Sequence, residues 1–167
     1  LDPTWTSADQ WQAALRTKAR TKVRSILTRS ADLDVERIHE TAELERLGPQ
    51  LIALYDQVYG RASIVMGGLE ARDFARLAEE LGPDFTVMTY RQEGRLVGFQ
   101  CGMHHRGSGT IEAYYVGFES EINKERALYQ RMLFEFIAWG ISLGAVRVVM
   151  GRTALEIKST LGAFPIA

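Results

Sequence analysis

Near residue 85 the spacing of apolar residues changes from that of helices to that of strands, and this change limits the fold more than any other feature. Before it, apolar residues recur at helical spacing. After it come three β-rich runs, 85–90, 96–103 and 110–118, joined by short polar segments that contain glycine. Such runs predict an antiparallel meander. The later apolar run 146–150 is typical of a buried central strand.

A long amphipathic segment separates the third β-rich run from the fourth. It begins at Asn123 or Lys124, ends at Gly144, and has an apolar face wide enough to lie on a sheet. A helix that crosses between two strands places them side by side and parallel. We therefore predict an α/β (α+β) fold, with a mixed sheet that is an antiparallel meander followed by a parallel βαβ unit, and amphipathic helices N-terminal to it.

The N-terminal region is basic. Residues 1–30 hold six Lys and Arg side chains against two Asp, although the whole chain has a net charge of −1. Ser7 to Gln10 form a capping box, and the apolar spacing after it predicts one helix of roughly five turns. We expect two units: a basic amphipathic helix over 1–30 and the domain proper over 31–167. The chain starts at Leu1 and ends in an apolar segment, so we expect a fragment that is incomplete at its C-terminus.

Composition excludes several classes of protein. The near-neutral net charge gives no global attraction to nucleic acid or to an anionic membrane. The single cysteine, Cys101, rules out an internal disulfide framework and favours the cytoplasm as the default compartment. No apolar run approaches the ~18 residues that a membrane span needs. The three His and the one Cys do not follow a metal-ligand spacing, so no metal site is predicted.

Two stretches resemble a known superfamily. The first begins at Ala113-Tyr-Tyr-Val-Gly and the second runs from Gly151-Arg-Thr through Glu156-Ile-Lys-Ser to Gly162-Ala. Both resemble the GNAT (Gcn5-related N-acetyltransferase) superfamily, in particular the branch of Fem-type peptidoglycan aminoacyltransferases and the related peptidoglycan biosynthesis/recognition acyltransferase-like proteins. The resemblance implies an acyltransferase that passes an acyl or aminoacyl group to a small-molecule or peptide amine, in cell-wall or envelope metabolism. It implies no covalently bound cofactor.

The donor stays open at this point. Relatives that use acetyl-CoA carry glycines at the start of the crossover helix, where backbone amides close on the pyrophosphate. Here Tyr129 and Arg131 occupy those positions, and their side chains would block that approach. An aminoacyl-tRNA donor, an acyl-CoA donor with an atypical loop, and a non-catalytic GNAT-like binding module are therefore three alternatives.

The resemblance also locates the reaction. The donor acyl group lies where the strand 110–118 and the strand 146–150 separate. The backbone amides near Val116 and Gly117 would be natural oxyanion donors, and Gly117 would let a ligand approach the backbone. Of the side chains on the strand, Glu112 is a candidate base and Tyr114 and Tyr115 are candidate acids.

Strand alternation predicts that Glu112 and Tyr114 share one face, with Tyr115 on the other. Each tyrosine has core packing as its alternative role. His104 and His105 follow in sequence near a turn, and we expect them to be exposed.

Further candidates for substrate or donor binding lie outside this strand. Each has a structural alternative: a helix cap for Asn123, core packing for Tyr129, a capping box with Thr153 for Glu156, and a solvated surface for the basic side chains. Arg152 follows a buried strand, where open sheets place ligand contacts. Lys158 is also a candidate for catalysis. The full set is Asn123, Tyr129, Arg152, Glu156, Lys158, and Lys18, Arg20 and Lys22 of the basic helix, which would face a tRNA arm or a lipid-linked substrate.

Overall fold

The centre of the protein is one five-stranded sheet in the order β1-β2-β3-β4-β5. The structure, a computed structural model, describes residues 1–60, 68–151 and 154–164. The first four strands pair antiparallel and β5 pairs parallel to β4, so the predicted meander with a parallel βαβ unit is confirmed. The expectation of a buried central strand at 146–150 is wrong, because β5 is the last strand in the sheet order and its residues are exposed or half-buried. The strands are β1 (Leu33–Ile38), β2 (Phe85–Gln92), β3 (Arg95–His105), β4 (Thr110–Phe118) and β5 (Arg147–Val149).

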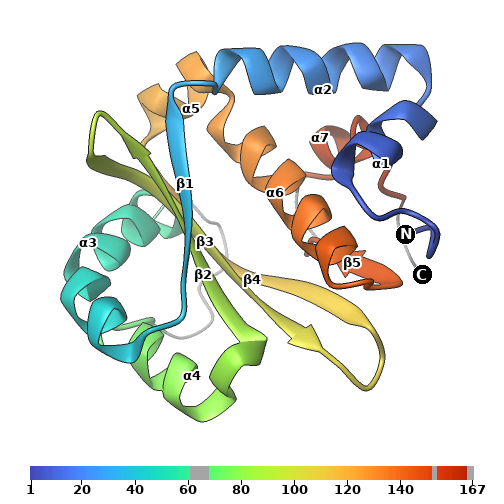
Figure 1. Ribbon diagram of the computed structural model, residues 1–167. Helices are drawn as coiled ribbons and strands as arrows, with labels where there is room; N and C mark the ends of the chain where they lie inside the picture. Colours follow the sequence, from blue (N-terminus) through green and yellow to red (C-terminus); the bar gives the residue numbers. More distant parts are fainter. Residues whose placement is uncertain (61–67, 152–153, 165–167) are drawn as a thin grey trace.

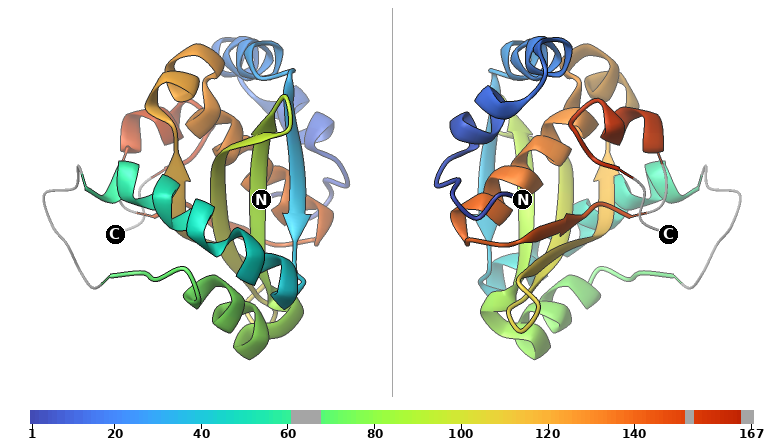
Figure 2. Two further views of the ribbon diagram at one scale, coloured as in Figure 1. Left: turned by 90° about the vertical axis from the view of Figure 1, so that its left-hand side faces the viewer. Right: turned by 90° about the vertical axis from the view of Figure 1, so that its right-hand side faces the viewer.

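Helices cover both faces of the sheet (Figures 1 and 2). One face carries α3 (Thr41–Tyr59) and α4 (Asp73–Leu81), followed by the short 3-10 helix η1 (Gly82–Asp84). The other face carries α5 (Ser120–Arg126) and α6 (Leu128–Ser142), with α1 (Ala8–Ala14), α2 (Thr17–Arg29) and α7 (Leu155–Ser159) packed around α6. The core therefore has two layers on the sheet and a third cluster outside α6.

The single N-terminal helix that we predicted is wrong, because the chain breaks at Leu15 and Arg16, which are extended. α1 buries Trp11, and α2 buries Val23 and Ile26, in the same cluster against α6. The break lets two short helices each turn an apolar face onto α6. The sequence carries no glycine or proline at this point, so the break was not visible there.

The crossover also differs from the prediction of one long helix. It divides at Ala127, which adopts a left-handed conformation with φ 53°. The Oδ1 atom of Asn123 accepts a hydrogen bond from the Tyr129 amide at 2.8 Å, so it caps the second piece, α6.

Small residues on β3 allow α6 to lie close to the sheet. A Cβ atom at Gly98 would be 2.7 Å from the Met132 side chain, and one at Gly102 would be 2.6 Å from the Phe136 ring. Between these glycines the buried side chain of Gln100 donates to the Tyr90 hydroxyl at 2.6 Å and to the Met132 carbonyl at 2.9 Å. These two hydrogen bonds satisfy polar atoms that burial would otherwise leave unbonded.

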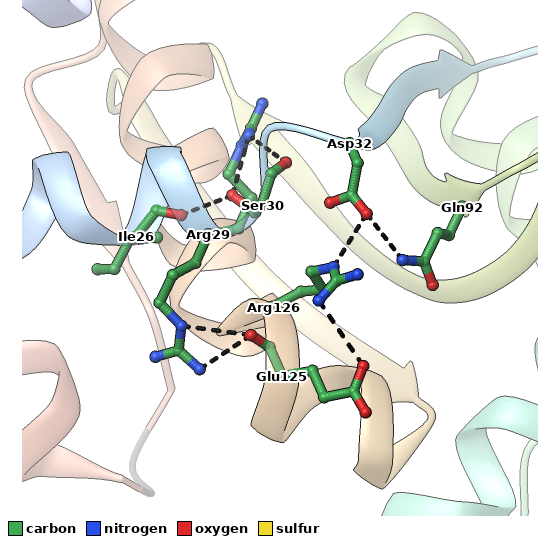
Figure 3. A network of polar contacts seen from close by, with 8 residues as sticks. Ile26, Arg29, Ser30, Asp32, Gln92, Glu125 and Arg126 are labelled. Atoms are coloured by element: carbon green, nitrogen blue, oxygen red, sulfur yellow. Dashed lines mark hydrogen bonds and ion pairs between the residues drawn. The ribbon is translucent and has the colours of Figure 1, made fainter.

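A polar network fixes α5 and the start of β1 to the C-terminal end of α2 (Figure 3). The guanidinium of Arg29 donates to the carbonyl of Glu125 at the end of α5. Arg126 donates to Asp32 at 2.9 Å, and Asp32 also accepts from Gln92 at 2.8 Å. These contacts place the basic helix α2 across the beginning of the crossover.

We expect Tyr90 to make the folding stability fall at alkaline pH. Burial raises the pKa of Tyr90 well above its ordinary value of 10.0, so above that pH the unfolded chain loses a proton that the folded chain keeps. The free energy of unfolding should then decrease by up to about 1.4 kcal/mol per pH unit from this group. Urea denaturation between about pH 9 and about pH 11 should show a shallower decrease for Tyr90→Phe. Equal slopes in the two proteins would contradict this assignment.

Candidate active site

The strands β4 and β5 pair over only three positions. Thr110, Ile111 and Glu112 face Arg147, Val148 and Val149, and no pairing continues beyond them. The edge of β4 from residue 113 to 118 is therefore without a strand partner among the described residues, while β5 ends (Figure 2). The two strands share one sheet and then diverge, as the predicted slot requires.

A β-bulge lies in β4 where this divergence begins. Gln100 of β3 pairs with Val116 and Gly102 pairs with Ala113, so Tyr114 and Tyr115 together face the single residue Cys101. A bulge bends the strand and increases its twist, and bulges occur often next to active sites. It also interrupts the alternation of side chains.

The bulge corrects the predicted arrangement of the tyrosines. Tyr115 packs in the cluster of α3 and α4, with its ring 5.9 Å from that of Tyr55. Its ring is also 6.4 Å from that of Tyr114. Tyr114 and Glu112 lie toward His105, which shares a face of β3 with the buried Cys101 and Phe99. All three candidates therefore occupy the α4 side, and the expectation that Tyr115 is on the opposite face is wrong.

His105 joins Glu112 and Tyr114 in one cluster, which sequence reasoning missed. Its Nε2 atom is 3.1 Å from the Glu112 carboxylate and 3.4 Å from the Tyr114 hydroxyl. The side chains of His105 and Glu112 are 36% and 40% exposed, so substrate and water can reach them. The antiparallel pairing of His105 with Thr110 across the 106–109 turn is the signal that would have brought it beside Glu112.

The protonation of this cluster suits donation by Tyr114. Burial, and then the neighbouring Glu112 carboxylate, raise the pKa of Tyr114, so its hydroxyl keeps its proton at neutral pH. Cys101 behind it is fully buried, and burial raises its pKa to about 12. The thiol is therefore a core group and not a nucleophile.

The backbone amides of β4 alternate between β3 and the open edge. The Glu119 amide donates to the Val97 carbonyl, so it points toward β3. By alternation the Gly117 amide also points toward β3, whereas the Val116 amide points to the open edge. Of the two predicted oxyanion donors, the strand geometry supports Val116.

Gly117 has a different reason to be glycine. A Cβ atom there would be 2.5 Å from the Tyr55 amide nitrogen and 2.6 Å from the Leu54 carbonyl carbon. The close approach that Gly117 permits is thus that of the backbone of α3, not that of a ligand.

Lys158 is buried, so the alternative of a solvated surface lysine is wrong. It is 4% exposed, and its Nζ atom donates to the Gly151 carbonyl at 3.2 Å, next to the end of β5. Desolvation by burial lowers its pKa. Glu156, by contrast, is exposed, and α7 begins at Leu155 without a side-chain cap. Arg152 and the capping-box Thr153 lie outside the described residues.

The structure at the start of α6 weakens the argument that the Tyr129 and Arg131 side chains would block a CoA donor. Arg131 does not cover the helix end, because it donates to Glu135 at 2.7 Å and to the Ser30 hydroxyl at 3.1 Å. Tyr129 is half-buried against Phe118, with ring centroids 5.9 Å apart, and burial raises its pKa. The residue with positive φ is Ala127, before the positions that we assigned to the missing glycines.

The basic helix does not present its charges uniformly. Arg20 donates to the Ala13 carbonyl at 3.1 Å and so links α2 to α1. Lys18 and Lys22 line a pocket between α2 and α7. These three candidates are therefore not brought to the β4–β5 slot.

A second pocket, of about 430 Å³, lies on the α4 side and includes Tyr115 in its wall. Its charged residues are Asp73, Arg76 and Glu80 of α4. The pocket adjoins the Glu112–His105–Tyr114 cluster through the contact of the two tyrosine rings.

Among the described residues, no group of three His, Cys, Asp or Glu side chains is arranged to hold a metal ion. No helix in the described parts of the chain is long and apolar enough to span a membrane.

Comparison with known families decides the class. The family described as acetyltransferase (GNAT) domain matches residues 13–159, most of the chain. The protein belongs to this family. It is an acyltransferase, and the family uses acetyl-CoA as a co-substrate, with no covalently bound cofactor. No curated protein matches the chain.

Solved structures show the same fold at low sequence identity. An aminoglycoside acetyltransferase from an uncultured soil metagenomic sample, in complex with sisomicin, has a TM-score of 0.59 at 16% identity, covering 82% of this chain and 93% of its own. A glucosamine-6-phosphate N-acetyltransferase from Arabidopsis thaliana has a TM-score of 0.57 at 19% identity, covering 81% and 93%. A GNAT family acetyltransferase from Staphylococcus aureus has a TM-score of 0.58 at 14% identity, covering 81% and 94%.

We expect Gly117→Ala to destabilise the fold. The added Cβ would meet the backbone of α3, which cannot move aside as a side chain can. The expected loss is about 1–3 kcal/mol in the free energy of unfolding, measured by urea denaturation. Gly107→Ala is the control, because nothing lies within 4 Å of a Cβ there. If the two variants were equally stable, the packing argument would be wrong.

We expect Tyr114→Phe and Glu112→Gln to lower kcat for acyl transfer by about a hundredfold each, since both would remove a proton-transfer group. The KM for the amine should change less than kcat. His104→Ala is the matched control, because His104 pairs with the buried Ile111 and so faces the other side of the sheet. A loss of activity equal to that control would remove these residues from the chemistry.

Proposed function

We propose that this chain transfers an acyl group from acyl-CoA to a primary amine in the slot beside β4. The observation that carries the proposal is the three-position pairing of β4 with β5, which leaves the Val116 amide on an open strand edge next to the Glu112–His105–Tyr114 cluster. The extended chain of an acyl-CoA, laid along this edge, would take the place of a further strand and bring its thioester carbonyl to the Val116 amide. The Val116 amide would then stabilise the oxyanion that forms.

The transfer needs two proton movements. The amine nitrogen attacks the thioester carbonyl, the C–N bond forms and the C–S bond breaks. Glu112, directly or through His105, takes the proton that the attacking nitrogen loses. Tyr114, which keeps its proton at neutral pH, donates to the thiolate that leaves. A ring contact joins Tyr115 to Tyr114, so Tyr115 positions the acceptor and is not needed for a proton.

The acceptor would enter from the α4 side. Asp73 and Glu80 give that pocket two carboxylates against the single cation Arg76, and neither carboxylate forms an ion pair with a described residue. Such a pocket attracts a cationic amine and releases the less charged amide product. One neighbour is an aminoglycoside acetyltransferase in complex with sisomicin, and another is a glucosamine-6-phosphate N-acetyltransferase. Both molecules contain an amino sugar, which makes amino sugars the first acceptors to test.

A narrower proposal is that the chain belongs to the Fem-type branch and transfers an aminoacyl group from aminoacyl-tRNA to a cell-wall acceptor in the cytoplasm. It rests on the residue resemblance at 113–133 and 150–163 alone. Calorimetry separates the donors, because micromolar binding of acetyl-CoA supports the CoA proposal. Transfer from aminoacyl-tRNA without any binding of acetyl-CoA would replace it with the narrower proposal.

We expect acetyl-CoA-dependent acetylation of a cationic amine, followed by release of free thiol. Asp73→Asn combined with Glu80→Gln should raise the KM for the amine by about tenfold, because the two carboxylates that attract the cationic amine would be lost, and should leave kcat within about twofold. Glu79→Gln is the control, since Glu79 is an exposed residue of the same helix that does not line the pocket. If none of the amines tested, amino sugars included, led to release of free thiol, the proposed function would be contradicted.

A further inference from the structure

The pocket between α2 and α7 lies on the opposite side of the sheet from the α4-side pocket that we assign to the acceptor. Helices α2 and α7 enclose about 590 Å³, which is within the range of about 300–1,000 Å³ for small-molecule sites. Its described lining combines the aliphatic surface of Ala19 and of the lysine stems with several hydroxyl groups. The residues that line it are Arg16, Lys18, Ala19, Thr21, Lys22, Ser25, Ser159 and Thr160.

Three cations line this pocket, and none of the described lining residues is acidic. Arg16, Lys18 and Lys22 form no ion pair and no side-chain hydrogen bond with any residue that the structure describes. Of the other cations of the same helix, two have structural partners, and Arg24 is exposed outside the pocket. Arg20 binds the Ala13 carbonyl and Arg29 binds the Glu125 carbonyl. The three lining cations thus repel one another without a structural contact that compensates.

Two of the three cations, Arg16 and Lys18, also stand at an unfavourable end of the helix. Arg16 is the N-cap of α2 and makes no side-chain cap, and the first turn holds no acidic residue. Positive charge near the positive end of a helix dipole is destabilising. A local arrangement that lowers stability without a visible gain is the pattern expected at a functional site.

We propose that the pocket between α2 and α7 binds a phosphorylated ligand with a ring or other apolar part. Lys18, Lys22 and Arg16 would pair with phosphate oxygens, and Thr21 and Ser25 have hydroxyls that can donate to them. The carbon surface of the pocket would receive the apolar part. A nucleoside bisphosphate has this combination of charge and ring.

The pocket is close to the slot. Lys158 of α7 binds the Gly151 carbonyl at the end of β5, and its neighbour Ser159 lines the pocket (Figure 1). One helix, about 10 Å across with its side chains, thus separates the two sites. The phosphate can come from the nucleotide end of the acyl-CoA donor or from a separate phosphorylated metabolite, and only the first source rests on the proposed function.

The test uses adenosine 3′,5′-bisphosphate as the probe, with the full chain and calorimetry. We expect binding that weakens when salt is raised from about 50 to about 200 mM. Lys22→Glu should weaken it by about tenfold or more. Arg24→Glu makes the same change of charge on an exposed position of α2 outside the pocket, and should weaken it by less than about threefold. Circular dichroism checks that both variants remain folded.

The outcomes separate the two sources and the two proposals. Competition between the probe and acetyl-CoA assigns the pocket to the donor's nucleotide end, and binding without competition assigns it to a separate ligand. No binding of the probe, or an equal loss in Lys22→Glu and Arg24→Glu, overturns the inference. Acyl transfer from a short pantetheine thioester, which lacks the nucleotide, tests the proposed function independently, because that donor does not need this pocket.

Discussion

The candidate site depends on the short pairing between β4 and β5. A parallel ladder that continued along both strands would satisfy every backbone group on the edge of β4 and leave no place for a carbonyl. The bulge at Tyr114 and Tyr115 bends β4 just after its last paired position, and β5 ends there. Open backbone amides and acid–base side chains are therefore produced by the same irregularity.

The bulge also decides which side chains meet. In a regular strand Tyr114 and Tyr115 would be on opposite faces, and only one would lie near Glu112. The extra residue puts both on the α4 side, where His105 of the neighbouring strand completes the cluster. The opposite face then carries α6, α7 and the basic helix α2. Two pockets of different charge consequently lie on different sides of one sheet.

Close packing keeps this arrangement fixed. Gly117 allows the backbone of α3 to rest on β4 next to the bulge, and Gly98 and Gly102 allow α6 to rest on β3. Gln100 connects β3 to the backbone of α6 and to Tyr90. Since these contacts lie on both sides of β3 and β4, movement of either helix would shift the strand edge where transfer is proposed.

The order of the elements could be predicted from the amino-acid sequence alone. The change of period near residue 85, the turns between the β-rich runs and the apolar run at 146–150 are local signals, and local signals are enough to predict a meander followed by a parallel unit. The sequence also placed Glu112, Tyr114 and Tyr115 on the strand next to the slot. The division of the N-terminal helix and of the crossover at Ala127 was not predictable, because no helix-breaking residue marks either point.

The strand register and the burial of individual side chains could not be predicted without the three-dimensional packing. The extra residue of the bulge is defined by pairing with β3, so no property of β4 alone could show that Tyr115 shares a face with Tyr114. The burial of Lys158 depends on where α7 packs, and the contact of His105 with Glu112 depends on the pairing across a turn. Each of these features is a relation between segments, whereas periodicity reports only on the segment in which it occurs.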